Sequence, residues 1–187
     1  MAKEKKEKTP GYEEFHDALQ SGAVGNVYIF HGEETYLMQQ AVAELQARLV
    51  PAGFEEFNYH RLAGKGLTMQ EVVEAAEAMP MMAERTLVTV EDMDLFRLDE
   101  AQRGALVALL EDFPEYCTLV FLYRQIPYKT DAKLKKLTVA LTERAQVIEF
   151  AQQGQQKLQN GGAPTFAAFA GPAGQTQSPG RALSGPP

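Results

Sequence analysis

The sequence is poor in several features that mark particular classes of protein. It contains one cysteine, Cys117, which excludes an internal disulfide framework and fits a reducing compartment. No apolar run approaches the ~18 residues of a membrane span. The N-terminal segment MAKEKKEKTP is charged and has no apolar h-region, so we predict no secretory signal. The expected location is therefore cytoplasmic, with no membrane partner.

Histidine is also scarce. His16, His31 and His60 are scattered along the chain and lack metal-ligand spacing, so the sequence predicts no metal and no cofactor. The lone Cys117 lies beside an apolar run, as a small core residue does, which argues against a nucleophile at this position.

Charge is distributed unevenly along the 187 residues, whose formal net charge is −7. All 25 acidic residues precede residue 151, and Lys157 and Arg181 are the basic residues that follow it. The acidity of the first 150 residues argues against broad binding to nucleic acid or acidic membranes. Residues 151–187 are rich in Gln, Gly, Ala and Pro, a composition that cannot bury enough apolar surface to order a chain. We therefore expect an arm and short helix at 1–20, one domain at 21–150 and a disordered tail at 151–187.

Apolar strands alternate with amphipathic helices through this domain, which indicates crossover units and a mostly parallel sheet. The expected strands are Val27–Phe30, Phe57–Leu62, Thr86–Val90, Thr118–Tyr123 and Val147–Phe150. The expected helices are Gly11–Gln20, Glu34–Leu49, Leu67–Ala78, Asp99–Asp112 and Asp131–Arg144, the last with Asp131 as its cap. The fold class is thus a compact three-layer α/β domain with five strands.

The stretch from Val27 to Gln40 has the layout of a nucleotide-binding site but not its chemistry. A phosphate loop, G-x-x-x-x-G-K-[ST], binds phosphates through backbone N–H groups and a lysine. Here Gly32 is followed by Glu33 and Glu34, with no second glycine and no lysine in register. The two carboxylates fit either a general acid/base pair or favourable charges at the start of the next helix. Neither role would favour a triphosphate.

Three methionines surround a helix-breaking proline in Met79-Pro80-Met81-Met82. Methionine fills gaps in cores, but it also suits adaptable binding surfaces. Because Pro80 interrupts the preceding helix, we expect some of these side chains at a corner rather than under the sheet.

Basic residues provide a further set of candidates. Arg124 follows the most apolar strand, where a partner or anion contact is one interpretation. Five basic residues lie on or near the last helix and fit either a solvated face or a phosphate contact: Lys129, Lys133, Lys135, Lys136 and Arg144.

Taken in order, three stretches resemble the N-terminal domain of the delta subunit of the bacterial DNA polymerase III clamp loader. Val27–Leu37 is similar to the family's apolar strand followed by G-[ED]-[ED]-x-[YF]-L. Met79–Val88 is similar to its apolar pair, short spacer, arginine and apolar strand. The third stretch is Lys129–Leu137, after the strand that ends at Tyr123, and within it Lys133–Leu137 resembles a basic segment of the family. Together they cover about residues 20–150.

The resemblance implies an AAA+-like (P-loop-NTPase-like) fold whose phosphate loop, at Gly32, Glu33 and Glu34, is degenerate. It implies no ATPase activity of its own, although the family is part of the DNA polymerase III holoenzyme. The apolar pair, here Met81 and Met82, would bind a pocket of the sliding clamp and help to open the clamp. Partners would be the clamp (beta subunit), the loader's ATPase subunits and delta-prime, with DNA reached only through the complex. Residues 151–187 resemble neither the lid nor the collar domain that follows in the family.

Two other classes of function remain open at this level. The first is a small α/β enzyme that uses Glu33, Glu34 or His31 at the carboxyl end of the first strand, where parallel sheets usually bind ligands. The second is a scaffold domain whose methionines belong to the core.

Overall fold

The computed structural model describes residues 10–64 and 66–151, which lie in the first of two compact units, Met1–Gln152. Its strands are β1 (Val27–Gly32), β2 (Tyr59–Leu62), β3 (Thr86–Glu91), β4 (Cys117–Tyr123) and β5 (Ala145–Phe150). Its helices are α1 (Tyr12–Gln20), α2 (Thr35–Leu49), α3 (Glu55–Asn58), α4 (Met69–Glu77), α5 (Glu100–Glu111) and α6 (Lys135–Arg144). The tail, residues 151–187, was expected to be disordered. Beyond Ala151 it lies outside the described residues.

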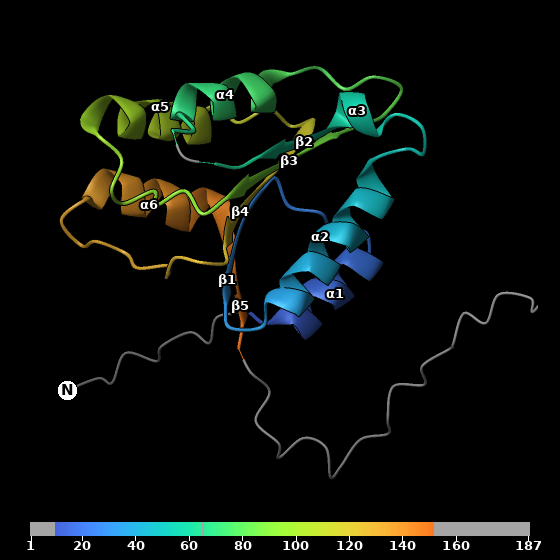
Figure 1. Cartoon of the computed structure of the whole chain (residues 1–187), viewed down its shortest axis with the longest axis horizontal. Helices are drawn as coiled ribbons and strands as arrows, with labels where there is room; N and C mark the ends of the chain where they lie inside the picture. The colour runs from blue at the N-terminus through green and yellow to red at the C-terminus, as the bar shows by residue number, and fades with distance from the viewer. Residues whose placement is uncertain (1–9, 65, 152–187) are drawn as a thin grey trace, which may run out of the picture. The chain divides into compact units, whose positions relative to one another are not determined.

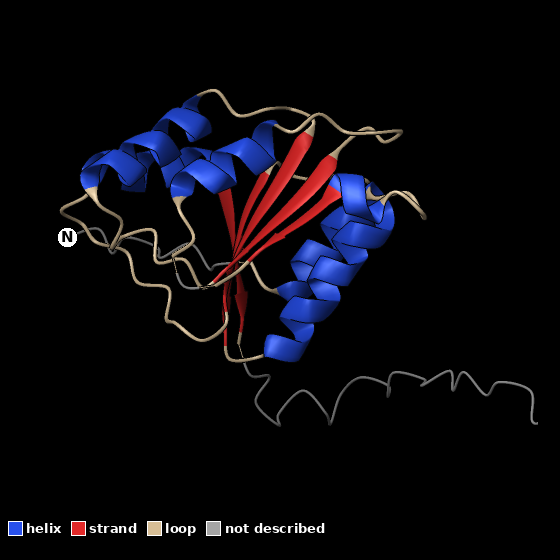
Figure 2. Cartoon of the chain, turned by 45° about the horizontal axis from the view of Figure 1, so that its top comes forward, coloured by secondary structure: helices blue, strands red, loops and turns tan. Residues whose placement is uncertain are grey.

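The strands form one parallel sheet in the order β2-β3-β4-β1-β5. In Figure 1, α1 and α2 cover one face while α4, α5 and α6 cover the other. Figure 2 shows the same three layers with the twisted sheet between the helices. The expected α/β class and mostly parallel five-stranded sheet are therefore confirmed.

Each face of the sheet has its own apolar core, because side chains alternate between faces along a strand. Tyr28 and Phe30 of β1 pack with α1 and α2, in a cluster that includes Phe15 and Leu45. Val27 and Ile29 point to the other face and pack with α4, α5 and α6. The central strand β4 is buried over its full length, as expected for a parallel strand covered on both sides.

Two helices begin with side-chain caps that the sequence makes possible. Thr68 caps α4 and accepts a hydrogen bond from the Glu71 N–H, while Glu71 bonds back to the Thr68 N–H at 2.8 Å. Asp99 caps α5 through the Gln102 N–H at 2.9 Å. These bonds stabilise the carboxylates and lower the pKa of both Glu71 and Asp99.

Two local predictions were wrong. Phe57 and Asn58 end the short helix α3 rather than begin a strand, because the Phe54 carbonyl accepts the N–H groups of both residues. Asp131 does not cap the last helix, which begins at Lys135. The Asp131 carboxylate instead accepts the Lys133 N–H at 2.9 Å, in a turn that precedes the helix.

Candidate functional site

The two candidate sites named from the sequence lie at opposite edges of the sheet. All strands are parallel, so they begin at one edge and end at the other. Met81 and Met82 precede the start of β3, whereas Gly32, Glu33 and Glu34 include and follow the end of β1. The structure therefore does not combine them into one site.

Residues 79–82, which we call the methionine corner, lie in the connection between α4 and β3. The relative exposure of Met79 is 74%, of Met81 46% and of Met82 77%. Together with Tyr36, Phe57 and Val139, they are the large exposed apolar side chains of the described residues. The alternative in which these methionines fill the core is wrong for all three.

A buried amide holds the methionine corner in place. Asn58, at the end of α3, is fully buried. Its Oδ1 accepts the Met81 N–H at 2.7 Å, and its Nδ2 donates to the Met81 carbonyl at 2.8 Å. The same Nδ2 donates to the carbonyl of Phe54, the N-cap residue of α3, at 3.1 Å, so the amide that holds the corner is itself fixed to the start of α3. Met82 follows with a φ of +54°, a left-handed conformation that is unusual for its side chain.

At the opposite edge, the turn after β1 is closely packed against the end of β5. Gly32 has a φ of +132°, and a Cβ there would lie 2.2 Å from the Phe150 carbonyl oxygen. The Glu34 N–H donates to that same oxygen at 3.0 Å. One backbone N–H that a phosphate loop would present to a ligand is thus already bonded within the chain. Glu34 occupies the N-cap position of α2, but its side chain makes no capping hydrogen bond.

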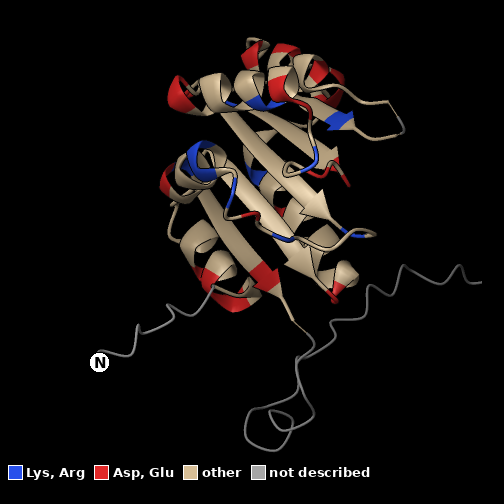
Figure 3. Ribbon diagram, turned by 90° about the vertical axis from the view of Figure 1, so that its left-hand side faces the viewer, with Lys and Arg blue, Asp and Glu red and all other residues tan. Residues whose placement is uncertain are grey.

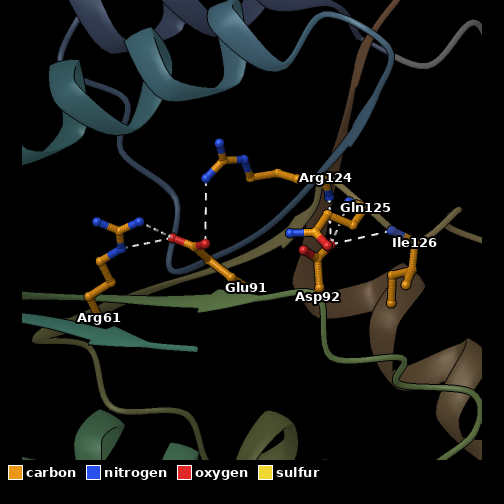
Figure 4. A network of polar contacts seen from close by, with 6 residues as sticks. All are labelled: Arg61, Glu91, Asp92, Arg124, Gln125 and Ile126. Atoms are coloured by element: carbon orange, nitrogen blue, oxygen red, sulfur yellow. Dashed lines mark hydrogen bonds and ion pairs between the residues drawn. The ribbon is translucent and has the colours of Figure 1, made fainter. Parts of the chain in front are cut away.

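The carboxyl ends of β2, β3 and β4 carry a charged network, shown in Figure 4. The Glu91 Oε1 accepts from Arg61 Nε at 2.8 Å and Nη2 at 2.7 Å. Arg124 Nη1 lies 3.4 Å from the other Glu91 oxygen. The partner or anion contact considered for Arg124 is therefore, in this structure, an internal ion pair.

Asp92 organises the connection that follows β4. Its Oδ1 accepts the N–H groups of Arg124 and Gln125, both at 2.8 Å, and that of Ile126 at 3.4 Å (Figure 4). Asp92 has a φ of +53°, which aspartate tolerates better than most residues. In P-loop enzymes an acidic residue near this edge holds Mg²⁺. Here both neighbouring carboxylates are occupied by donors of the chain itself.

A small hollow of about 210 Å³ adjoins this network, between α2 and the sheet. Its lining includes Met38, Gln46 and Tyr59 beside the charged groups. Within residues 10–64 and 66–151, no group of three or more His, Cys, Asp or Glu side chains is placed to hold a metal ion. None of the helices in these ranges has the length and apolar character of a membrane span.

The remaining sequence candidates occupy ordinary structural positions. His31 lies with its ring centroid 5.1 Å from that of Tyr128, and burial lowers the pKa of His31. His16 Nδ1 lies 2.8 Å from a carboxylate oxygen of Glu44, joining α1 to α2. Cys117 is fully buried, and burial raises the pKa of its thiol to about 11, as expected for a core cysteine rather than a nucleophile.

The charged surface is mainly acidic. In Figure 3, acidic segments lie on helices of both layers, and basic segments are fewer. Lys133, Lys135 and Lys136 are exposed around the start of α6. Their exposed positions fit both interpretations, a solvated helix face and a phosphate contact.

Sequence reasoning missed Asn58, Glu91 and Asp92 as organising residues. Asn58 falls inside a predicted strand, and the sequence indicates no hydrogen-bond partner for its side-chain amide. Asp92 follows an apolar strand directly, a position that could have drawn attention to it.

Comparisons with known proteins agree with this arrangement. The family model for the DNA polymerase III delta subunit matches residues 28–151. The chain is 30% identical to DNA polymerase III subunit delta of Bacillus subtilis over 139 aligned residues, in a match that covers 71% of this chain and 39% of that protein. The structure resembles the Bacillus subtilis DNA clamp loader delta protein with a TM-score of 0.66 and 26% identity, over 78% of this chain and 44% of that one.

A second solved structure shows the fold alone. It is a DNA polymerase III gamma subunit-related protein of Thermotoga maritima, with a TM-score of 0.50 and 13% identity, over 80% of this chain and 48% of the other. The chain thus spans less than half the length of each of these relatives. The expected three-layer AAA+-like domain is confirmed, whereas the degenerate phosphate loop stays a prediction. From the match over residues 28–151, the chain belongs to the DNA polymerase III delta-subunit family, a clamp-loader family of DNA replication.

Proposed function

We propose that this domain binds a sliding clamp through Met81 and Met82 and helps to open the clamp, without hydrolysing ATP itself. The proposal extends to partners: the clamp first, then the loader's ATPase subunits and delta-prime, with DNA reached through the complex. Its expected location is the cytoplasm.

The observation that carries the proposal is the adjacent, exposed methionine pair. Exposed methionines that are free of the core have apolar surface to bury against a partner. Burying one methionine fully contributes ~1.5–3 kcal/mol. Side chains at the centre of a small interface can act as hot spots that cost on the order of 2 kcal/mol each when truncated.

The carboxyl edge of the sheet supports the absence of ATP hydrolysis. Glu33 and Glu34 follow β1 where a phosphate loop would supply a lysine. Glu91 and Asp92 are bonded to Arg61 and to the N–H groups after β4. A nucleotide at this edge would meet negative charge and would have to displace internal bonds. The alternative of an enzyme using His31 lacks support, because no hydrogen-bonded carboxylate or nucleophile accompanies His31 among the described residues.

The test is clamp binding by the chain carrying Met81→Ala and Met82→Ala. We expect a loss of affinity of roughly a hundredfold to a thousandfold, since each 1.4 kcal/mol is a factor of ten. Because both side chains are exposed, the melting temperature should hardly change. Tyr36→Ala with Val139→Ala is the matched control, since it removes two exposed apolar side chains elsewhere and should leave affinity unchanged. Normal clamp binding by the methionine variant would end the proposal.

A further inference from the structure

We propose that Asn58 is a positioning residue for the methionine corner: its buried amide holds the Met81 backbone and so presents Met81 and Met82 to the partner. This inference rests on the proposed function, because it concerns the same site. It adds a residue from another element, 23 positions earlier in the chain, that makes the corner competent to bind.

The amide of Asn58 uses both of its N–H groups and its oxygen, and it joins two segments, the short helix α3 and the methionine corner. Its oxygen accepts the Met81 N–H at 2.7 Å. Its two N–H groups serve two carbonyls, of Met81 at 2.8 Å and of Phe54 at 3.1 Å. The pair of bonds to Met81 imitates the exchange of two hydrogen bonds between residues of paired strands. A fully buried side chain with this pattern ties the corner to the residues just before β2.

The methionine corner lies outside regular secondary structure. The residues from Pro80 to Arg85 are bends and irregular backbone between α4 and β3. Pro80 has no N–H to donate. Met82 keeps a left-handed conformation, which persists only when the surrounding structure determines it. The two hydrogen bonds between Asn58 and Met81, one residue earlier, are the contacts best placed to hold this conformation.

Positioning of this kind acts on affinity through preorganisation. If the corner is ordered before binding, association does not have to order it. If the hydrogen bonds from Asn58 are removed, the methionines keep their apolar surface, but several backbone and side-chain torsions must be fixed on binding. We expect the affinity to fall about tenfold to a hundredfold, less than when both methionines are truncated.

The experiment compares Asn58→Ala with Val72→Ala in the full chain. Val72 is fully buried in α4, so its truncation lowers stability without removing a bond to Met81. Clamp affinity is measured by calorimetry at a temperature where each variant is folded. In parallel, the methyl signals of Met81 and Met82 in the free chain report their mobility by NMR relaxation. Asn58→Ala should lower affinity and raise methyl mobility, whereas Val72→Ala should change neither.

A second variant covers the case in which alanine unfolds the domain. Asn58→Leu keeps about the same volume and leaves no cavity, but it removes the acceptor for the Met81 N–H and the donors to both carbonyls. We expect the same direction of change in affinity and mobility. Combining either Asn58 variant with Met81→Ala and Met82→Ala should add little further loss, because Asn58 acts through these side chains.

The outcomes separate this inference from the proposed function. If the methionine variant loses clamp binding while the Asn58 variants keep it, the positioning role is overturned and the proposed function stands. If Asn58→Ala and Val72→Ala reduce affinity equally, Asn58 is only a stabilising residue, which also overturns the inference. If the methionine variant binds normally, the proposed function and this inference fail together.

Discussion

Asp92 offers a sharp test of how the carboxyl edge of the sheet is organised. Its Oδ1 accepts three successive backbone N–H groups, those of Arg124, Gln125 and Ile126. Asp92→Ala removes this acceptor and leaves the three donors to partial solvation. It also places alanine at a φ of +53°, where aspartate is better tolerated.

The expected magnitude follows from these contacts. A hydrogen bond to a charged group contributes ~1.5–3 kcal/mol. The three bonds share one oxygen, and Gln125 is exposed to water, so their contributions do not add fully. We expect Asp92→Ala to lower the free energy of unfolding by about 2–4 kcal/mol. Asp92→Asn keeps the Oδ1 acceptor without its charge and should cost about 1 kcal/mol.

The assay is urea unfolding followed by far-ultraviolet circular dichroism, which suits a chain without tryptophan. Asp94→Ala is a matched control nearby, because the Asp94 Oδ1 accepts a single N–H, from Phe96 at 3.1 Å. It should cost less than Asp92→Ala. Equal losses for the alanine and asparagine variants at Asp92 would refute the role given to its oxygen. So would a loss below about 1 kcal/mol for Asp92→Ala.

Three further predictions concern the same edge of the sheet. Calorimetry with ATP and Mg²⁺ should show no tight binding, since Glu33 and Glu34 replace the basic residue of a phosphate loop; a micromolar dissociation constant would contradict this. Gly32→Ala should destabilise the domain by about 2–4 kcal/mol, because Gly32 has a positive φ and the new Cβ would clash with the Phe150 carbonyl. In the control Gly104→Ala, in α5, the new Cβ meets no atom within 4 Å, and the change should stabilise the domain by up to about 1 kcal/mol. Burial lowers the pKa of His31 in the folded state, so its contribution to stability is present above pH 6.5 and is lost as the pH falls through the folded pKa. The free energy of unfolding, measured from pH 7.5 downward, should show this loss. If His31→Gln has the same dependence of this free energy on pH as the original chain, His31 is not its source.

The sequence by itself determined the class of fold and most of its elements. Apolar, β-branched runs such as Thr86–Val90 form buried strands because only strands covered on both faces accommodate continuous apolar residues. Periodic helices between these strands demand crossovers, and crossovers between neighbouring strands produce a parallel sheet. Pro80 predicted a corner, and the exposure of Met81 and Met82 agrees with that prediction. Each of these inferences depends on local composition and period.

Only the tertiary structure decided which distant residues form polar contacts and which segments those contacts hold together. Asn58 lies in a stretch that reads as a strand, yet its amide bonds to residue 81 and α3 replaces the strand's start. Arg124 and Glu91 are 33 positions apart and meet only because β3 and β4 are neighbours in the sheet. Hydrogen bonds and ion pairs have no period in the sequence, because their partners are chosen by the packing of elements rather than by spacing along the chain. The methionine corner could therefore be found from its residues, but what holds it in place could be found only from the fold.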